Sequence, residues 1–145
     1  MILKEAAMEE AETVANLAIQ MWEDNSIEEL TEEFRNYINS ENGVVFLAVL
    51  DGGAVGFAQC GVRHDYVEGT DTSPVGYLEG IFVVEEYRRR GLAKDMLLAC
   101  EKWAKEQGCT EFASDCELEN EDSLRFHLKM GFKEANRIIC FAKNL

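Results

Sequence analysis

The chain has 145 residues, enough to bury a hydrophobic core as one domain without disulfides or metal. Its 28 acidic and 14 basic residues give a net charge of −14, which opposes binding to nucleic acid. This charge suits a polycationic ligand, but on its own it needs no explanation beyond solubility. No stretch approaches the roughly 20 apolar residues of a membrane span, and the first residues lack the layout of a signal peptide, so we expect a cytoplasmic protein.

The first half of the chain predicts a strand, two helices and a β-hairpin. Ser26 followed by Glu29 matches a capping box, which indicates a helix start. Asp51-Gly52-Gly53 between two apolar runs is typical of a hairpin turn. The predicted elements are a strand over 2–6, helices over 9–22 and from Ser26 towards Tyr37, and strands over 44–50 and 55–62.

The second half predicts alternating strands and helices after a polar loop. Asn120 is a suitable helix cap, and Gly131 a suitable helix stop. The predicted elements are a loop over 64–75, strands over 77–84 and 111–116, helices from Gly91 to about Glu106 and from Asn120 to Met130, and strands over 132–134 and 137–141. This order predicts an α/β fold with a mixed sheet and helices on both faces.

The segment 88–93, Arg-Arg-Arg-Gly-Leu-Ala, lies between a predicted strand and a predicted helix. The first N–H groups of a helix lack partners and carry a partial positive charge, so this place suits an anion. Gly91 and Ala93 allow close backbone approach, and the three arginines add charge. The segment therefore predicts a phosphate-binding turn, although a basic surface turn is the alternative.

Five cysteines are scattered without any CxxC pair: Cys60, Cys100, Cys109, Cys116 and Cys140. We expect reduced residues, mostly in the core, rather than a disulfide or zinc framework. A Cys–His nucleophile with His64 or His127 is a less favoured alternative, because no local sequence marks an activated thiol.

Two signatures resemble those of the GNAT acetyltransferases, which use acetyl-CoA. The first is the Arg-x-x-Gly-x-Ala turn over 88–93, and the second is Asn120 followed by Phe126-His127 and Gly131-Phe132. In that family a tyrosine is common at the position of His127. The resemblance implies the GNAT fold, a central mixed, mostly antiparallel sheet flanked by helices on both faces.

Four further blocks resemble the aminoglycoside 6′-N-acetyltransferases within that family. They are Met21-Trp22 and the segments 66–70, 73–81 and 110–115. The resemblance covers nearly the whole chain. It implies transfer of acetyl from acetyl-CoA to the 6′-amino group of aminoglycoside antibiotics, and it implies a homodimer.

The same resemblance implies roles for individual residues. Those expected to contact the aminoglycoside are Trp22, Tyr66, Glu79, Asp115 and Asn136, the last where related members have a glutamate. Those expected to hold the coenzyme are Ile81, Phe82, Val83, Arg88, Arg89, Arg90, Gly91, Leu92, Ala93, Lys94 and Asn120. No metal is expected.

The chemistry of acyl transfer to an amine fits the expected catalytic residues Glu79, Asp115 and His127. The attacking nitrogen must be uncharged, so a carboxylate has to hold an ammonium group and then relieve it of a proton. His127 can protonate the departing thiolate in place of the usual tyrosine, and a strand N–H near Val83 can stabilise the oxyanion.

Other interpretations of these residues and of the chain stay open from sequence. Trp22 at helical spacing suits a core position, and His127 suits a hydrogen-bonded residue on a helix face. A GNAT enzyme for another amine, such as a polyamine or a protein N-terminus, is the nearest alternative function. A non-catalytic acetyl-CoA-binding module is the other, but it has no need for both carboxylates.

Overall fold

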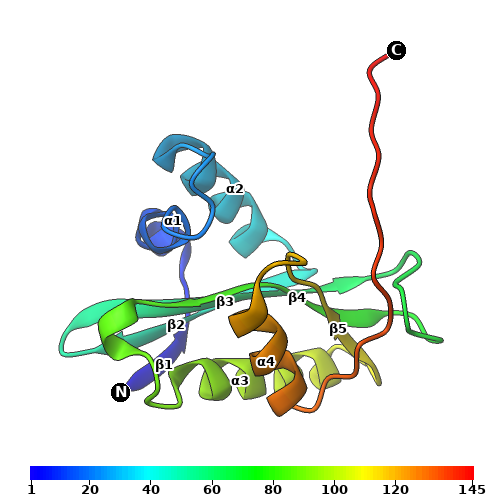
Figure 1. Ribbon diagram of the computed structural model, residues 1–145. Helices are drawn as coiled ribbons and strands as arrows, with labels where there is room; N and C mark the ends of the chain where they lie inside the picture. Colours follow the sequence, from blue (N-terminus) through cyan, green and yellow to red (C-terminus); the bar gives the residue numbers. More distant parts are fainter.

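The computed structural model describes all 145 residues, which form a five-stranded sheet with two helices on each face (Figure 1). The strands lie in the sheet in chain order, and neighbours are antiparallel except for the parallel pair β4 and β5. Their bounds are β1 Ile2–Glu5, β2 Gly43–Leu50, β3 Gly53–Arg63, β4 Val75–Val83 and β5 Phe112–Ser114. The expected mixed, mostly antiparallel sheet is confirmed.

The helices α1 and α2 cover one face of the sheet, and α3 and α4 lie on the other (Figure 1). On the first face Leu30 and Phe34 pack with residues of β2 and β3, and on the second Met96 and Leu97 of α3 are buried against the sheet. The helix bounds are α1 Ala11–Ala18, α2 Ile27–Asn39, α3 Leu92–Glu106 and α4 Glu121–Lys129, with short 3-10 turns η1 Met8–Glu10 and η2 Glu85–Tyr87.

Short-range sequence signals account for where these elements begin and end. The hydroxyl of Ser26 accepts a hydrogen bond from the backbone N–H of Glu29 at 3.1 Å and caps α2. Asp51 and Gly52 have φ of 53° and 80°, so the hairpin loop between β2 and β3 has the left-handed residues that match strand twist. The predicted helix over 9–22 is shorter than expected, because η1 and a turn after Ala18 replace its ends.

The strand β4 loses one of its two neighbours halfway along its length. Gly76, Tyr77 and Leu78 pair with β5, whereas the following residues pair only with β3. The edge of β4 from Glu79 onwards therefore carries no partner strand on the β5 side. This edge leads directly to η2 and to the turn that begins α3.

The two strands predicted at the C-terminal end are wrong. Residues 132–145 form neither helix nor strand, and the last of them extend away from the sheet as a tail (Figure 1). Ile138, Ile139 and Phe141 in this tail are 70%, 80% and 90% exposed. Their apolar, β-branched and aromatic character favours strand, but a strand needs a neighbour to pair with, and the tail pairs with neither the free edge of β4 nor the outer edge of β5.

None of the helices is both long enough and apolar enough to cross a membrane.

Candidate functional site

Glu79 lies at an irregularity in the pairing of β4 with β3, where side chains no longer alternate regularly between the two faces of the sheet. Its neighbours Leu78 and Gly80 pair with consecutive residues of β3, so Glu79 is the extra residue of a bulge. Its carboxylate accepts hydrogen bonds from Arg63 at the end of β3. The Nη2 atom of Arg63 lies 2.8 Å from Oε1 and 2.9 Å from Oε2, and Nε lies 3.2 Å from Oε2. This is a bidentate ion pair in which neither side chain is fully buried.

Tyr77 connects this ion pair to the second expected carboxylate. The guanidinium carbon of Arg63 lies 3.5 Å from the centroid of the Tyr77 ring, and the Tyr77 hydroxyl donates a hydrogen bond to Asp115, which directly follows β5. Burial, and next the hydrogen bond to Asp115, raise the pKa of Tyr77, so its phenol stays protonated at neutral pH. We call Arg63, Tyr77, Glu79 and Asp115 the carboxylate cluster.

Trp22 lies on the sheet beside the carboxylate cluster. A Cβ atom added to Gly80 would lie 2.8 Å from the indole ring, so the ring rests on the backbone next to Glu79. On its other side the indole stacks on Phe34, with ring centroids 6.3 Å apart, and meets the edge of Phe57. Trp22 is half-buried. It therefore belongs to the core, as its helical spacing in the sequence suggests, and it also borders the site.

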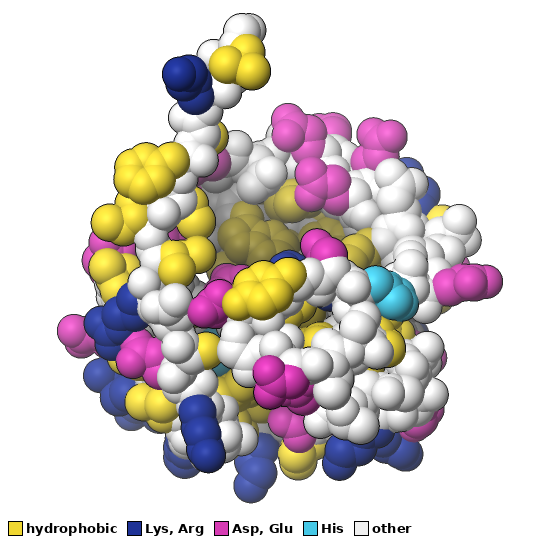
Figure 2. Space-filling view, turned by 90° about the vertical axis from the view of Figure 1, so that its right-hand side faces the viewer, with side chains coloured by type: hydrophobic (Ala, Val, Ile, Leu, Met, Phe, Trp, Pro, Cys, Tyr) yellow, Lys and Arg dark blue, Asp and Glu magenta, His cyan; other side chains and the backbone are white.

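An open cleft of about 310 Å³ lies next to Trp22. Glu23 and Asp24 line it from the segment between α1 and α2, and Glu117 lines it from the segment between β5 and α4. Figure 2 shows the end of the molecule from which the tail rises. Its surface is hollowed, with hydrophobic side chains inside the hollow and acidic ones around it. A cation that approaches here meets negative charge from several segments.

The loop 64–74 carries Tyr66, which is 78% exposed. The Tyr66 hydroxyl donates to Glu68 at 2.7 Å, and the Asn136 amide donates to the same carboxylate at 3.1 Å. These hydrogen bonds, that of Tyr66 first, lower the pKa of Glu68. The structure thus brings Tyr66 and Asn136, each expected at the aminoglycoside, to one carboxylate that sequence reasoning did not single out.

Glu111 fastens the same loop to the start of β5. Its carboxylate accepts hydrogen bonds from the backbone N–H groups of Asp71 at 2.9 Å and Thr72 at 2.8 Å, and from the Thr72 hydroxyl. These bonds, that of the Thr72 hydroxyl first, lower the pKa of Glu111. The loop is therefore held at both of its flanks, by Glu111 on one side and by the Glu68–Asn136 contact on the other.

The start of α3 has the geometry predicted for a phosphate-binding turn. Gly91 precedes the helix with φ of 81°, and no side chain caps the first N–H groups. No atom lies within 4 Å of the place where a Cβ of Gly91 would be. Arg88 donates from Nε to the Val83 carbonyl at 2.7 Å and places its guanidinium 5.6 Å from the Phe82 ring centroid. An anion can therefore reach the helix start, with cationic side chains beside it.

The other residues expected at the coenzyme differ in what they can offer. Arg89 and Lys94 are exposed, and the Arg90 guanidinium lies 5.2 Å from the Tyr87 ring centroid. Leu92 is buried in the core that α3 shares with the sheet. Only the backbone N–H of Leu92 is therefore placed for a ligand at the turn.

His127 of α4 is held at the point where β4 and β5 part. Its Nδ1 atom lies 2.7 Å from the Ser123 carbonyl oxygen and carries a proton, because a carbonyl only accepts. Its Nε2 atom lies 2.8 Å from the Ser114 hydroxyl, which also lies 3.3 Å from the Leu78 carbonyl. Asn120 accepts a hydrogen bond from the Ser123 N–H at 3.1 Å and caps α4, as expected.

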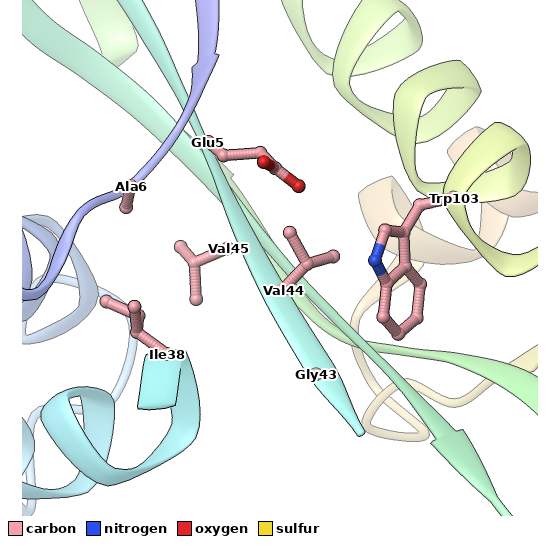
Figure 3. A pocket seen from close by; sticks show the side chains of 7 residues that line it. All are labelled: Glu5, Ala6, Ile38, Gly43, Val44, Val45 and Trp103. Atoms are coloured by element: carbon pink, nitrogen blue, oxygen red, sulfur yellow. The ribbon is translucent and has the colours of Figure 1, made fainter. Parts of the chain in front are cut away.

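A small cavity at the other edge of the sheet contains none of the expected site residues. It has a volume of about 140 Å³ where β1 leaves β2, and seven residues line it (Figure 3). Val44 points towards Trp103 of α3, whereas Val45 lies on the side of Ile38, at the end of α2. Five of the cavity's seven lining residues are hydrophobic and only Glu5 is charged, whereas three carboxylates line the cleft beside Trp22.

The cysteines are free thiols, and the expectation that they lie in the core holds for three of them. Cys60, Cys100 and Cys109 are buried, whereas Cys116 and Cys140 are exposed, because the segments after β5 and after α4 leave the sheet. No group of three or more His, Cys, Asp or Glu side chains is arranged to hold a metal ion.

Sequence reasoning missed Arg63, Tyr77 and Ser114, which hold the expected residues in place. One signal was available for Arg63, since it is a charged residue at the end of an otherwise mostly apolar strand, just before the polar loop. The partners of Tyr77 and Ser114 depend on the register of β4 against β5, which a single sequence does not give.

The chain matches the family model described as Acetyltransferase (GNAT) family over residues 11–132. It is 41% identical over 130 residues to an aminoglycoside N(6′)-acetyltransferase type 1 of Serratia marcescens, with 89% of each chain covered. To the enzyme of the same name from Acinetobacter baumannii it is 42% identical, with 86% of each chain covered.

Solved structures agree with these sequence matches. The aminoglycoside N-acetyltransferase AAC(6′)-Iy in complex with CoA superposes with a TM-score of 0.95 at 35% identity, over 99% of this chain and 95% of that one. The 6′-N-acetyltransferase AAC(6′)-Ih from Acinetobacter baumannii superposes with a TM-score of 0.92 at 37% identity, over 99% and 98%. With the sheet, the uncapped helix start and the matches over most of its length, the chain belongs to the GNAT acetyltransferases, in the group of aminoglycoside N(6′)-acetyltransferases.

Proposed function

We propose that this protein transfers the acetyl group of acetyl-CoA to the 6′-amino group of aminoglycoside antibiotics and thereby confers resistance. The observation that carries the proposal is the similarity over most of the chain to enzymes named for this reaction, at 41% identity to one of them. The acidic cleft and the carboxylate cluster support it, because an aminoglycoside carries several ammonium groups.

The substrate lies between Trp22, the carboxylate cluster and the loop that carries Tyr66. Glu79 and Asp115 hold its ammonium groups, and Trp22 offers an aromatic face beside them. Tyr66 and Asn136 form the far wall through their shared contact with Glu68. Asn136 brings no charge of its own, so Glu68 supplies the negative charge at this wall.

Acetyl-CoA lies along the free edge of β4 and at the start of α3. The backbone of Ile81, Phe82 and Val83 pairs with the pantetheine arm, since no strand occupies the β5 side of this edge. The pyrophosphate binds at the turn, and Asn120 contacts the coenzyme from the start of α4. The coenzyme residues at the turn are Arg88, Arg89, Arg90, Gly91, Leu92, Ala93 and Lys94.

The reaction proceeds in one ternary complex. The bound ammonium gives a proton to a carboxylate of Glu79 or Asp115, and the neutral nitrogen attacks the thioester carbonyl. A carbon–nitrogen bond forms, a backbone N–H near Val83 stabilises the oxyanion, and the carbon–sulfur bond then breaks. Most of the rate gain comes from holding amine and thioester in attack geometry.

His127 passes a proton to the departing thiolate: its Nε2 atom takes the proton that the amine nitrogen loses after attack and gives it to the sulfur. The Ser123 carbonyl fixes the proton on Nδ1, so Nε2, which faces Ser114, is the nitrogen that exchanges a proton at the site. Ser114 therefore orients the imidazole and connects it to the place where β4 and β5 part. In the absence of substrate, both ring nitrogens of His127 have a partner, as expected of a hydrogen-bonded residue on a helix face.

The protein acts as a single catalytic domain and as a homodimer in the cytoplasm. The family match spans residues 11–132 as one continuous region, which supports a single catalytic domain over 1–145. The exposed Ile138, Ile139 and Phe141 need a partner surface, and a second copy supplies one. The free thiols suit a reducing compartment.

A panel of amines tests the function directly. Purified protein should release coenzyme A from acetyl-CoA with kanamycin- and tobramycin-like substrates that carry a 6′ amine, and poorly with analogues that carry a 6′ hydroxyl. NMR of the product should place the acetyl group on the 6′ nitrogen. Preferred turnover of polyamines or peptides would favour the other GNAT function, and binding without any turnover would favour a binding module.

Gly91→Val should weaken acetyl-CoA binding at least about tenfold, or ~1.4 kcal/mol, because valine disfavours the positive φ at the helix start and its side chain occupies the space of the pyrophosphate. Gly108→Val is the matched control. Gly108 has φ of 91° at the other end of α3 and equally open surroundings. Calorimetry that finds the same affinity in both folded variants would remove the coenzyme from this turn.

Glu79→Gln and Asp115→Asn should each lower kcat/KM for kanamycin by about tenfold to a hundredfold, since charge-assisted hydrogen bonds contribute ~1.5–3 kcal/mol. Acetyl-CoA affinity should not change. Asp115→Asn should also lower the pKa of Tyr77, because the Asp115 carboxylate helps to raise it, so its phenolate absorbance should appear at lower pH. Glu106→Gln, exposed at the end of α3, is the control. Unchanged kinetics in both variants would make the carboxylates structural.

Removal of residues 137–145 should convert the protein from a dimer into a monomer in analytical ultracentrifugation, where the intact chain of 16.4 kDa should sediment at twice its mass. Replacing Ile138, Ile139 and Phe141 with serine should have the same effect, because their apolar surface is the proposed contact. Replacing Lys143 and Asn144 with serine should leave the dimer intact. A monomeric intact chain would contradict the proposal.

A further inference from the structure

Arg63 forms an ion pair with Glu79, although the proposed function assigns the Glu79 carboxylate to a cationic substrate. Its guanidinium makes three hydrogen bonds to the two oxygens of Glu79. The guanidinium carbon also lies over the Tyr77 ring, 3.5 Å from its centroid, which adds a second contact that holds the group in place. A positive charge held this firmly at a cation-binding site opposes cation binding, so it requires a reason in the reaction itself.

The charges around the pair come from few groups. Tyr37 of α2 and Cys60 of β3 interact electrostatically with Glu79, and Tyr77 and Asp115 interact with Arg63. Burial raises the pKa of Tyr37 and Tyr77, and hydrogen bonding to Cys100 with burial raises that of Cys60, so these three groups are neutral near pH 7. Among the groups that interact with the pair, the charge therefore comes from two carboxylates and one guanidinium, while Glu23, Asp24 and Glu117 add negative charge from the neighbouring cleft.

Acyl transfer needs the amine in its neutral form, and the surrounding charges decide how readily an ammonium gives up its proton. Two carboxylates without a nearby cation stabilise the ammonium and delay its deprotonation to higher pH. A guanidinium beside one of them cancels part of that field. It makes the neutral amine accessible at lower pH, at the expense of some binding strength.

We propose that Arg63 is a positioning residue for this reaction: it holds the Glu79 carboxylate in a fixed orientation and cancels its charge, so that the substrate amine can release its proton beside Asp115. The inference rests on the proposed function. Arg63 orients Glu79 through the bidentate contact and balances the site through its charge. These two contributions can be separated, because lysine keeps the charge but not the planar fork.

The test is the pH dependence of kcat with kanamycin, which reports groups in the enzyme–substrate complex. Arg63→Met should move the acidic limb of this profile upward by about one pH unit and lower kcat at pH 7 by up to about tenfold. At pH values above the shifted limb, kcat should return towards that of the unaltered protein. Arg63→Lys should keep the position of the limb, while any loss in kcat/KM from the missing fork appears at all pH values.

A double variant and a remote control complete the design. Arg63→Met combined with Glu79→Gln removes one charge of each sign, so its acidic limb should return to within about 0.3 pH units of the unaltered protein, even if its rate is low. Arg35→Met, on the exposed side of α2, makes the same charge change away from the site and should not move the limb. Circular dichroism and acetyl-CoA affinity should match in all variants.

The outcomes separate the inference from the function. In one outcome, the unaltered protein acetylates kanamycin while Arg63→Met leaves the acidic limb of the kcat profile at the same pH. That result would overturn the role of Arg63 and leave the proposed function intact. An unaltered protein that acetylates no aminoglycoside would overturn both. If Arg63→Met does not fold, Arg63→Gln takes its place with the same expected shift, because glutamine also removes the charge and retains a polar side chain.

Discussion

The site depends on one constraint, the loss of β5 as a neighbour of β4 after Leu78. Up to this residue β4 is paired on both sides, and beyond it only β3 remains. The backbone that follows has an edge without a strand partner, and it leads directly into the turn before α3. The bulge in the pairing of β4 with β3 lies at the next residue, Glu79, so the free edge and the carboxylate that leaves the strand alternation begin at the same place along β4.

The two proposed substrates carry opposite charges, and the chain separates their binding places along β4. In the proposed complex the anionic coenzyme lies at the uncapped start of α3, beside the arginines of the turn. The proposed place of the cationic substrate is beside Glu79, Asp115 and the acidic cleft next to Trp22. In a protein with a net charge of −14, each arginine near the site changes the local field against a negative background, and the proposed role of Arg63 rests on this effect.

Segments distant in sequence complete the substrate side of the site. The loop 64–74 is fastened by Glu111 to the start of β5, and Glu68 joins it to Asn136 beyond α4. The walls around the carboxylate cluster are therefore polar and exposed, whereas its floor rests on the aromatic core of Trp22, Phe34 and Phe57. A firm floor with adaptable walls suits a substrate whose reacting ring must be fixed while its other rings vary.

The sequence by itself determined the features that short-range interactions decide. Helix caps at Ser26 and Asn120, the hairpin turn at Asp51 and Gly52, and the glycine at the start of α3 each act within a few residues, so their positions could be predicted. Hydrophobic periodicity placed the helices and the paired strands for the same reason. The resemblance carried by the turn and by Glu79 and Asp115 named candidate site residues, but not what holds them.

Only the tertiary structure decided which of those residues share a contact. The fork of Arg63 on Glu79 and the hydrogen bond of Tyr77 to Asp115 depend on strand register and on a bulge, where a shift of one residue would turn each side chain to the other face. The C-terminal residues also show that composition alone does not decide tertiary pairing. Their composition favours strand, yet residues 132–145 remain irregular, because a strand forms only where another edge can satisfy its backbone hydrogen bonds.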